Sequence, residues 1–580
     1  MKASWLHRLR FGRPPSRHEL VLGLLLLITV GLRVAWLTYV NVDPNERVDD
    51  SVFYHRAAEA LAGGGGYDDP WTGRPTAQWP PAYPAVLALA YLPPGQNLLA
   101  GKALNVALAL AGVLLTYLVA SRLFSRRAGL LAALVLAVFP SYVYLSTLIF
   151  SENLFVPAFL LVLLLVVRWG LADRQPTALQ SLAVGAVIAF SALVRAEGIW
   201  LLGPALVVWL VAARGRATAT RNAVLVLAGT AVLLAPWTVR NALQLHEFAP
   251  VRSGASASLG VGLSPDYEQY GPVPPPVPLP TVGDDLRFYL ERPWHVFVLL
   301  GKKAYDLYEN DHDIVYWVHW VALGPAAYRR WQDVADAAYY GFGAVALGGL
   351  TLLLLARHRG ALFLGGVILT WTLGMALIIP EPRYHFALLP LLSILASVVA
   401  TQSSGVFGES GFLRGRGPQV ATSMLAVGAV IAAVTIGLGF DDGVPRAPYQ
   451  APVALAARVG ETLNLGELEV TVRDFSPQRG EDGMPVPRPG YVWLVVDATV
   501  RNVGTAEALL FDAQAVVEDA DGNLYLPQAA LPVTRSLDGS LRPGETLQGS
   551  VVYAVPADAP HLEFVFTLLG VAVEGRWVLE

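Results

Sequence analysis

The feature that most constrains this chain is a series of long hydrophobic segments separated by polar loops. A transmembrane helix needs about 20 mainly apolar residues. Eleven segments approach or reach that length, at residues 19–40, 98–120, 128–146, 152–168, 178–194, 199–213, 222–239, 336–356, 361–379, 384–401 and 419–438. We therefore expect a polytopic α-helical membrane protein with about eleven transmembrane helices.

Composition agrees with this architecture and excludes other classes. Of the 580 residues, 54% are hydrophobic and 15% are charged, whereas soluble domains carry about 25% charged residues. Cysteine is absent, which excludes disulfides, thiolate metal sites and thiol nucleophiles. The net charge of −4 does not favour a nucleic-acid partner.

The arginines predict the orientation. Residues 1–18 are basic and no small-residue cleavage site follows the first span, so we expect a retained helix with a cytoplasmic N-terminus. Each short loop that then lies inside is positively charged, as the positive-inside rule requires. The arginines of these loops are Arg122, Arg126, Arg127, Arg168, Arg174, Arg214, Arg216, Arg221, Arg357, Arg359, Arg414 and Arg416. An odd number of spans puts the C-terminus outside. Arginine is preferred to lysine, which is typical of GC-rich bacterial genes. We expect a multi-pass protein of a bacterial plasma membrane.

The sequence divides into a membrane domain, a linker and a C-terminal domain. We assign residues 1–440 to the membrane domain, with two long outer segments at 41–97 and 240–335. Within the second outer segment, residues 293–303 have an apolar body and a basic end, which is typical of a helix in the membrane interface. Residues 441–460 are a linker that contains proline and alanine. Because every inner loop is short, we expect the chemistry on the extracytoplasmic side.

Residues 461–580 alternate apolar and polar side chains with period two, which predicts half-buried strands. The clearest strands are 467–475, 491–501, 508–517, 546–553 and 561–568, separated by turn sequences such as Arg542-Pro543-Gly544. We expect an antiparallel all-β sandwich. It resembles the immunoglobulin-like, telokin-like domains of bacterial surface proteins, and it contains no cluster of candidate catalytic residues.

An acidic pair, Asp49-Asp50, opens a short amphipathic segment directly after the first span. A carboxylate at a helix start accepts hydrogen bonds from unpaired backbone N–H groups, so an N-cap is the simplest interpretation of either residue. A general base is the alternative, and the motifs in the rest of the chain favour it.

Several short patterns follow one another within residues 20–400, at the expected outer ends of spans. They are Asp49-Asp50…Tyr54…Ala57-Ala58 with Gly65-Gly66-Tyr67, Pro80-Pro81-Ala82-Tyr83-Pro84, Ser151-Glu152-Asn153, Val194-Arg195-Ala196-Glu197-Gly198, Ala235-Pro236-Trp237-Thr238-Val239-Arg240-Asn241 and Arg383-Tyr384-His385-Phe386. Together they resemble the GT-C glycosyltransferases, in the bacterial branch related to protein O-mannosyltransferases and lipid A aminoarabinose transferases. Many relatives have Asp-Glu where this chain has Asp49-Asp50, and the sandwich is an addition to the family's core.

The resemblance implies an inverting transferase that takes a mannose- or pentose-like sugar from a polyprenyl-phosphate carrier. Such an enzyme needs a carboxylate to accept the acceptor's proton, cations to hold the phosphate and an apolar groove for the prenyl chain. It implies Asp49 or Asp50 as the base, and Asp49 matches the family's leading acid. Glu152 would position the acceptor or the sugar, or it is a helix-start carboxylate on the helix dipole.

Arg383 with Tyr384 is the first candidate for the phosphate, because a guanidinium binds phosphate oxygens through two parallel bonds. Lys302 and Lys303 come second, since they are half of all lysines in the chain. The further candidates are Arg240, Arg195, Arg33 and Tyr54. The alternative for each cation is an anchor whose charged head reaches the membrane surface, and this includes Arg33 inside the first span.

No cofactor is expected besides the lipid-linked sugar donor, and no convincing Gly-x-Gly-x-x-Gly pattern follows a strand. Glu309, Asp311, His312 and Asp313 form an acidic cluster that we interpret as a solvated loop rather than a divalent-metal site. A monoester phosphate leaving group needs less charge neutralisation than a nucleoside diphosphate, so an essential metal is not predicted.

The implied partners are the bilayer, the polyprenyl-phosphate sugar and a hydroxyl of a protein, lipid or glycan. The alternative function is a transporter or flippase of lipid-linked sugars, which would need polar or broken helices at the bilayer centre and internal repeats. A membrane-anchored binding protein would need far fewer spans.

Overall fold

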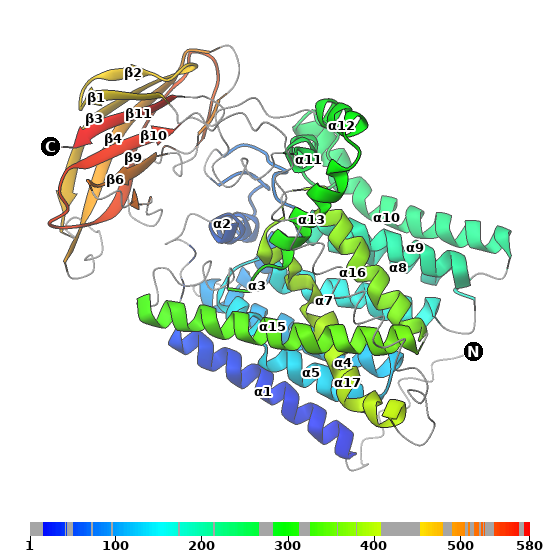
Figure 1. Ribbon diagram of the computed structural model, residues 1–580. Helices are drawn as coiled ribbons and strands as arrows, with labels where there is room; N and C mark the ends of the chain where they lie inside the picture. The colour runs from blue at the N-terminus through cyan, green and yellow to red at the C-terminus, as the bar shows by residue number, and fades with distance from the viewer. Residues whose placement is uncertain are drawn as a thin grey trace.

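The structure is a computed structural model (Figure 1). It describes residues 16–40, 42, 44, 50–70, 73–93, 97–171, 175–212, 215–265, 282–312, 325–356, 358–378, 380–407, 453–479, 490–504, 508–510, 515–520, 524–525, 527, 537, 539–567 and 573–579. Helices occupy the part before residue 408 and strands the part after residue 452.

The helical domain follows the hydrophobic segments of the sequence. Its elements are α1 (Arg17–Tyr39), α2 (Asp50–Ala62), α3 (Ala82–Tyr91), α4 (Asn97–Leu123), α5 (Arg126–Val138), α6 (Pro140–Tyr144), η3 (Leu145–Thr147), α7 (Glu152–Leu165), η4 (Val166–Gly170), α8 (Ala178–Val194), η5 (Ala196–Leu201), α9 (Leu202–Ala212), α10 (Arg216–Gln244), α11 (Ala255–Leu263), α12 (Val282–Glu291), α13 (His295–Tyr308), α15 (Pro325–Leu355), α16 (Arg359–Met375), η7 (Pro382–Leu388) and α17 (Leu389–Phe407). The segments labelled η are 3-10 helices, apart from η4, which is a π-helix.

The expected number of eleven spans is not confirmed. Among the described residues, six helices are long and apolar enough to cross a membrane, and a seventh span results if α5 and the segment Pro140–Thr147, bent by 65°, count as one. The expected spans at 178–194, 199–213 and 361–379 correspond to shorter apolar helices, at Ala178–Val194, Ala196–Val211 and Arg359–Met375. The expected span 419–438 lies outside the described residues. Apolar composition does not reveal where a turn ends a helix early, so these three segments are shorter as helices than as apolar stretches.

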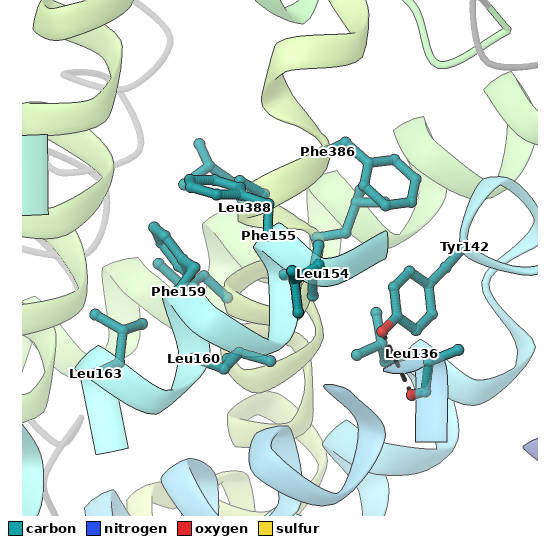
Figure 2. Close-up of a cluster of buried hydrophobic side chains, with 14 of the residues drawn as sticks. Leu136, Tyr142, Leu154, Phe155, Phe159, Leu160, Leu163, Phe386 and Leu388 are labelled. Carbon is teal, nitrogen blue, oxygen red and sulfur yellow. Dashed lines mark hydrogen bonds between the residues drawn. The ribbon is translucent and has the colours of Figure 1, made fainter. Parts of the chain in front are cut away.

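Two spans form the centre of the helical domain. Burial reaches 78% in the apolar window of α7 with η4 and 72% in that of Pro382–Thr401, but only 22% in those of α1, α10 and α15. Figure 2 shows Phe155 and Phe159 of α7 in one cluster with Phe386 and Leu388 of η7. A helix that is apolar all round is buried on all sides, whereas the three outer helices expose an apolar face suited to lipid.

Arg33 binds the backbone at the bend between α5 and α6. Its side chain is fully buried, and its guanidinium donates to the carbonyl oxygens of Thr29 and Ala137 at 3.1 Å and of Tyr142 at 3.2 Å. A helix end leaves carbonyls without partners inside the helix. The expectation that Arg33 reaches the membrane surface is therefore wrong, because the broken helix supplies acceptors nearby.

The two long outer segments contact each other. Arg240, near the end of α10, donates to the carbonyl oxygens of Thr76 at 2.6 Å and Tyr67 at 2.7 Å. The Ser253 N–H donates to the carbonyl oxygen of Ala77 at 2.9 Å. These bonds hold the segment between α2 and α3 against the end of α10.

The C-terminal β-sandwich is confirmed. One sheet has the strand order β1-β11-β10-β6-β7, a second has the order β2-β3-β4-β9, and β5 pairs with β8. The strands are β1 (Val453–Arg458), β2 (Thr462–Asn464), β3 (Leu468–Gln478), β4 (Tyr491–Asn502), β5 (Ala508–Leu510), β6 (Ala515–Glu518), β7 (Leu524–Tyr525), β8 (Gly539–Leu541), β9 (Thr546–Pro556), β10 (Leu562–Thr567) and β11 (Val573–Leu579). Alternate residues of β4, among them Val496, Ala498 and Val500, enter a core that includes the fully buried Trp577.

Two details of the sandwich differ from the expectation. The strand β1 lies inside the segment 441–460 that we assigned to the linker, and it pairs parallel with β11. Its outward residues Ala454 and Ala456 are apolar, so the sequence does not show the alternation. The expected strand 508–517 is divided into β5 and β6, and residues 511–514 lie outside the described residues.

Candidate active site

Five residues proposed from the sequence meet at one end of the helical domain. Asp50 and Glu152 are the first residues of α2 and α7, Arg195 lies between α8 and η5, and Arg383 and Tyr384 belong to η7. Each is therefore at the end of a helical element, where a side chain can reach those of neighbouring helices. Asp49, the other member of the acidic pair, lies outside the described residues.

Arg195 is the centre of a first polar group. Its Nη1 lies 2.6 Å from Glu152 Oε1, and its Nε lies 3.5 Å from Glu197 Oε2. Nη1 also donates to Ser151 Oγ at 3.3 Å, and the Tyr54 hydroxyl donates to the same oxygen at 3.1 Å. The side chains of Arg195 and Glu152 are only 12% and 7% exposed, so each charge depends on the other for stabilisation. Burial raises the pKa of the Tyr54 hydroxyl, which stays a neutral donor.

Arg383 is the centre of a second polar group. Its Nε donates to Glu381 Oε2 at 2.5 Å, and its Nη1 donates to Asp50 Oδ2 at 3.3 Å. The other oxygen of Asp50 accepts from Trp79 Nε1 at 3.1 Å. Both oxygens of the Asp50 carboxylate are thus bound by donors from other segments. The exposed fraction is 9% for Arg383, 28% for Asp50 and 39% for Glu381.

Tyr384 lies near both guanidiniums, and the three side chains line a common cavity. The centre of the Tyr384 ring is 5.2 Å from Arg195 Cζ and 5.6 Å from Arg383 Cζ. The empty space between these side chains is about 240 Å³, part of which is open solvent. Its polar lining also includes Glu152 and Glu197, and its apolar lining consists of Phe155, Val156, Trp371, Phe386 and Ala387. Charged and apolar side chains therefore lie side by side on the walls of this cavity.

Local breaks in the helices place the two arginines. Arg195 has an extended backbone, with φ −146° and ψ 131°, between α8 and η5. A Cβ atom on Gly198 would lie 2.5 Å from the backbone of Ser191, so this approach of η5 to α8 requires glycine. On the other side of the cavity, η7 begins at Pro382, a residue well suited to the first position of a helix.

Four residues of these groups were not among the candidates drawn from the sequence. They are Trp79, Ser151, Glu197 and Glu381. Ser151 and Glu197 lie inside the quoted motifs, whereas Trp79 and Glu381 lie just outside two of them. An acid two residues from an arginine at a helix boundary, as in Glu197 and Glu381, is the signal that could have found two of the four.

Other candidate cations bind backbone carbonyls instead of lining the cavity. Lys303 of α13 donates to the carbonyl oxygens of Gly262, Ala376 and Ile378, and so joins α13 to α11 and to the end of α16. Three carbonyls match the three N–H bonds of an ammonium group. Lys302 is also buried on α13. Arg240 and Arg33 make the backbone contacts described above.

The acidic cluster in the second outer segment is not a solvated loop at Asp311. The Asp311 side chain is only 3% exposed and lies 3.0 Å from His385 Nε2, whereas His312 pairs with Asp336 at 2.7 Å. Asp313 lies outside the described residues. Within the described ranges, no group of three or more His, Asp or Glu side chains is arranged to hold a metal ion.

Comparison with known protein families identifies two matching segments of the chain. Residues 78–239 match the family model described as dolichyl-phosphate-mannose-protein mannosyltransferase, and residues 457–572 match that of a domain of unknown function. No curated protein matches the chain.

Three solved structures represent the similar folds. An oligosaccharyltransferase of Archaeoglobus fulgidus tethered with an acceptor peptide is 15% identical over 72% of this chain, with a TM-score of 0.43, and the match covers 54% of that protein. A conserved hypothetical protein of Bacillus anthracis is 22% identical over 19% of this chain and 87% of its own length, with a TM-score of 0.17. The secreted protein MPT63 of Mycobacterium tuberculosis is 18% identical over 22% of this chain and 98% of its own length, with a TM-score of 0.18.

The mannosyltransferase match confirms the resemblance to protein O-mannosyltransferases for residues 78–239, which include Glu152 and Arg195. It supports a membrane glycosyltransferase with a lipid-linked sugar donor as the function class. Asp50, Arg383 and Tyr384 lie outside the matched segment, so their connection to that function rests on the geometry of the cavity.

Proposed function

We propose that this chain is an inverting glycosyltransferase of the membrane surface. It moves a mannose- or pentose-like sugar from a polyprenyl-phosphate carrier to a hydroxyl of an extracytoplasmic protein, lipid or glycan. The cavity between Arg195, Tyr384 and Arg383 carries this proposal, because two guanidiniums and an apolar wall meet there beside carboxylates. The match to the mannosyltransferase family supports the donor class.

The donor phosphate would lie between the two guanidiniums. Arg383 is held by Glu381, the most exposed carboxylate of the two groups, which can turn toward water when a phosphate takes its place. Arg195 faces the cavity from the other side and keeps the buried Glu152 as its partner. The prenyl chain would follow the apolar wall formed by Phe155, Trp371 and Phe386.

Asp49 is the better candidate for the base. Two donors already bind the Asp50 carboxylate, Trp79 and Arg383, and hydrogen bonds to the charged form weaken a base. Asp50 would therefore orient Arg383, and its neighbour would face the acceptor. Asp49 also corresponds to the leading acid of the pair in the related enzymes that the sequence resembles.

The proposed step is a single displacement. The base removes the proton of the acceptor hydroxyl, and the acceptor oxygen forms a bond to the anomeric carbon while the bond from that carbon to the phosphate oxygen breaks. The electron pair leaves with the phosphate, whose added negative charge Arg383 and Arg195 stabilise. Attack opposite the leaving group inverts the anomeric centre.

One experiment distinguishes transfer of the sugar from translocation of the lipid-linked sugar. Full-length protein in proteoliposomes is given radiolabelled polyprenyl-phosphate mannose or pentose together with extracytoplasmic extract as acceptor. We expect label on an acceptor other than the polyprenyl carrier, and free polyprenyl phosphate in equal amount. Label that changes leaflet while still attached to polyprenyl phosphate would contradict the proposal and identify a flippase.

A comparison of cells with and without this protein identifies the sugar and the acceptor. Glycans, glycolipids and glycoproteins of a strain lacking the chain are compared by mass spectrometry with those of the parent strain. We expect one hexose or pentose mass to disappear from a single acceptor class, and a plasmid-borne copy to restore it. Restoration should fail with the Asp49→Asn variant.

A further inference from the structure

His385 of η7 is buried between two hydrogen-bond acceptors. Its Nε2 lies 3.0 Å from Asp311 Oδ1, and its Nδ1 lies 3.0 Å from the carbonyl oxygen of Leu307. The exposed fractions of the His385 and Asp311 side chains are 1% and 3%. The imidazole stacks on Tyr339, with ring centres 4.5 Å apart. Neither His385 nor Asp311 lines the cavity described above.

This geometry requires a proton between the imidazole and the carboxyl group. A carbonyl oxygen only accepts, so Nδ1 must carry a proton and donate it to Leu307. In a neutral ring Nε2 then has a lone pair, which would face a carboxylate oxygen of Asp311. The contact is attractive when the ring is an imidazolium or when Asp311 is a carboxylic acid. Both forms keep one proton in the bridge.

The surroundings of the pair raise the pKa of the Asp311 carboxyl group. Burial raises the pKa of Asp311, while His385 and the nearby Ser141 hydroxyl lower it and Asp336 raises it. Other titratable or charged groups come from each element around the pair. They are Tyr308 of α13, Tyr144 of α6, Tyr339, Tyr340 and Asp336 of α15, and Arg383 and Tyr384, which precede His385 on η7 itself.

The pair joins the end of α13 to the turn that carries the candidate phosphate ligands. Leu307 belongs to α13 and Asp311 follows it, whereas His385 comes directly after Arg383 and Tyr384. We propose that Asp311 and His385 are positioning residues whose shared proton holds Arg383 and Tyr384 in place at the cavity. The role of the turn rests on the function proposed above, but the proton-dependent contact itself does not.

The sign of the pH dependence follows from the bridge. Below the usual imidazole pKa of about 6.5, a histidine in the unfolded chain is protonated. Because the contact needs this proton, its stabilisation decreases as the pH rises and the proton is lost. After this loss two acceptors face each other, and we expect η7 to loosen.

Two variants of Asp311 distinguish the bridge from simple packing. In Asp311→Asn the amide N–H can donate to Nε2, so the bridge persists without a titratable proton. In Asp311→Leu the branching of the side chain is kept but the bridge is lost. We expect Asp311→Asn to behave like the wild type at low pH and to show no alkaline change.

A readout independent of catalysis tests the contact itself. Hydrogen exchange of residues 380–388 is compared by mass spectrometry in wild type and Asp311→Asn at equal pH, between about pH 6 and 9, around the usual imidazole pKa. We expect equal exchange at pH 6 and about tenfold faster exchange of the wild type at pH 9. Identical exchange at every pH would overturn the proposal, and this comparison remains valid if Asp311→Leu does not fold.

A second readout tests the consequence for the site. In the wild type we expect the KM for the polyprenyl-phosphate donor to rise about tenfold from pH 6 to 9, and to stay level in Asp311→Asn. If the KM of the wild type stays as level with pH as that of Asp311→Asn, the positioning role is wrong. If exchange behaves as expected but neither protein transfers sugar, the proposed function fails while the proton-dependent contact stands.

Discussion

At the scale of single residues, the charges of the candidate site act in sets rather than one by one. Arg195 and Glu152 are both buried, at 12% and 7% exposure, so removal of either would leave a buried charge without its partner. Such a loss costs about 3–5 kcal/mol of stability. Substitutions that keep shape and hydrogen bonding are therefore the informative ones here, because larger truncations would report on folding.

Asparagine separates the catalytic and capping roles of the acidic pair. Asn is a good N-cap, so Asp49→Asn keeps the helix start but cannot take a proton. We expect kcat to fall about 10²- to 10⁴-fold, the usual contribution of a general base, while donor binding persists. Asp50→Asn should mainly raise the KM for the donor, because it weakens the contact with Arg383. Glu59→Gln, also on α2, is the control. Near-normal turnover of both variants would mean that the pair is only a cap.

Replacement of Arg383 by lysine tests the phosphate assignment. Lysine keeps the positive charge, but an ammonium group cannot reproduce the planar fork that contacts Glu381 and Asp50 together. We expect kcat/KM for the donor to fall about 10- to 100-fold, the equivalent of one charge-assisted hydrogen bond. Arg330→Lys, at an exposed position of α15, should leave kcat/KM unchanged. Equal values for all three proteins would remove Arg383 from the site.

At the scale of elements, α12 and the start of α13 present an uncovered apolar face. Leu286 and Leu290 are 59% and 76% exposed, and Trp294 and Phe297 are 77% and 66% exposed. Leu286 and Leu290 are four residues apart on α12, which puts them on one face of that helix, whereas Trp294 lies in the turn before α13. Trp294 and Phe297 fall within the segment 293–303 where we expected an interfacial helix, and the exposed leucines of α12 come just before it. We infer that the face is inserted at the boundary of the outer leaflet.

The absence of cysteine makes this inference testable without background labelling. Single variants Leu290→Cys and Glu291→Cys carry a spin label in lipid nanodiscs, and collisions with oxygen and with a water-soluble nickel complex are measured. We expect the label at 290 to favour oxygen and its neighbour at 291 to favour nickel, because adjacent helical residues point in different directions. Equal access of nickel to both positions would place the face in water.

At the scale of the whole molecule, the chain has two separate hydrophobic cores. One joins the helices before residue 408 and the other joins the strands after residue 452. Every residue of the candidate site belongs to the helical domain. The sandwich is therefore expected to bind an acceptor, the cell wall or a partner protein, and not to take part in the chemistry.

Truncation after residue 440 tests whether the sandwich is dispensable for sugar transfer. We expect the shortened protein to transfer sugar to a small soluble acceptor at a rate close to that of the full chain. Transfer to the natural acceptor should decrease if the sandwich recruits it. Size-exclusion chromatography in detergent serves as the folding control. A well-folded truncated protein without any transfer would show that the sandwich contributes to the site.

The sequence alone determined the class of the protein and most of its elements. Apolar length and the periods of 3.6 and two residues are local properties, so they predicted the helices that build the membrane domain and the β-sandwich. Motifs at helix boundaries also led to Asp50, Tyr54, Glu152, Arg195, Arg383 and Tyr384, which the structure brings together. These residues share a position that is visible in the sequence, at the end of an apolar segment.

Only the tertiary structure decided which cations face the cavity. Arg33, Arg240 and Lys303 were candidates beside Arg195 and Arg383, but distant segments offer them carbonyl oxygens instead of carboxylates. The partners of Arg383 show the same limit, since Asp50 is 333 residues away in the sequence. Asp311 was interpreted as solvated for this reason too, because the imidazole that buries it comes from another helix 74 residues later. The sequence therefore gives the charge of a side chain, whereas packing between elements determines which group pairs with it.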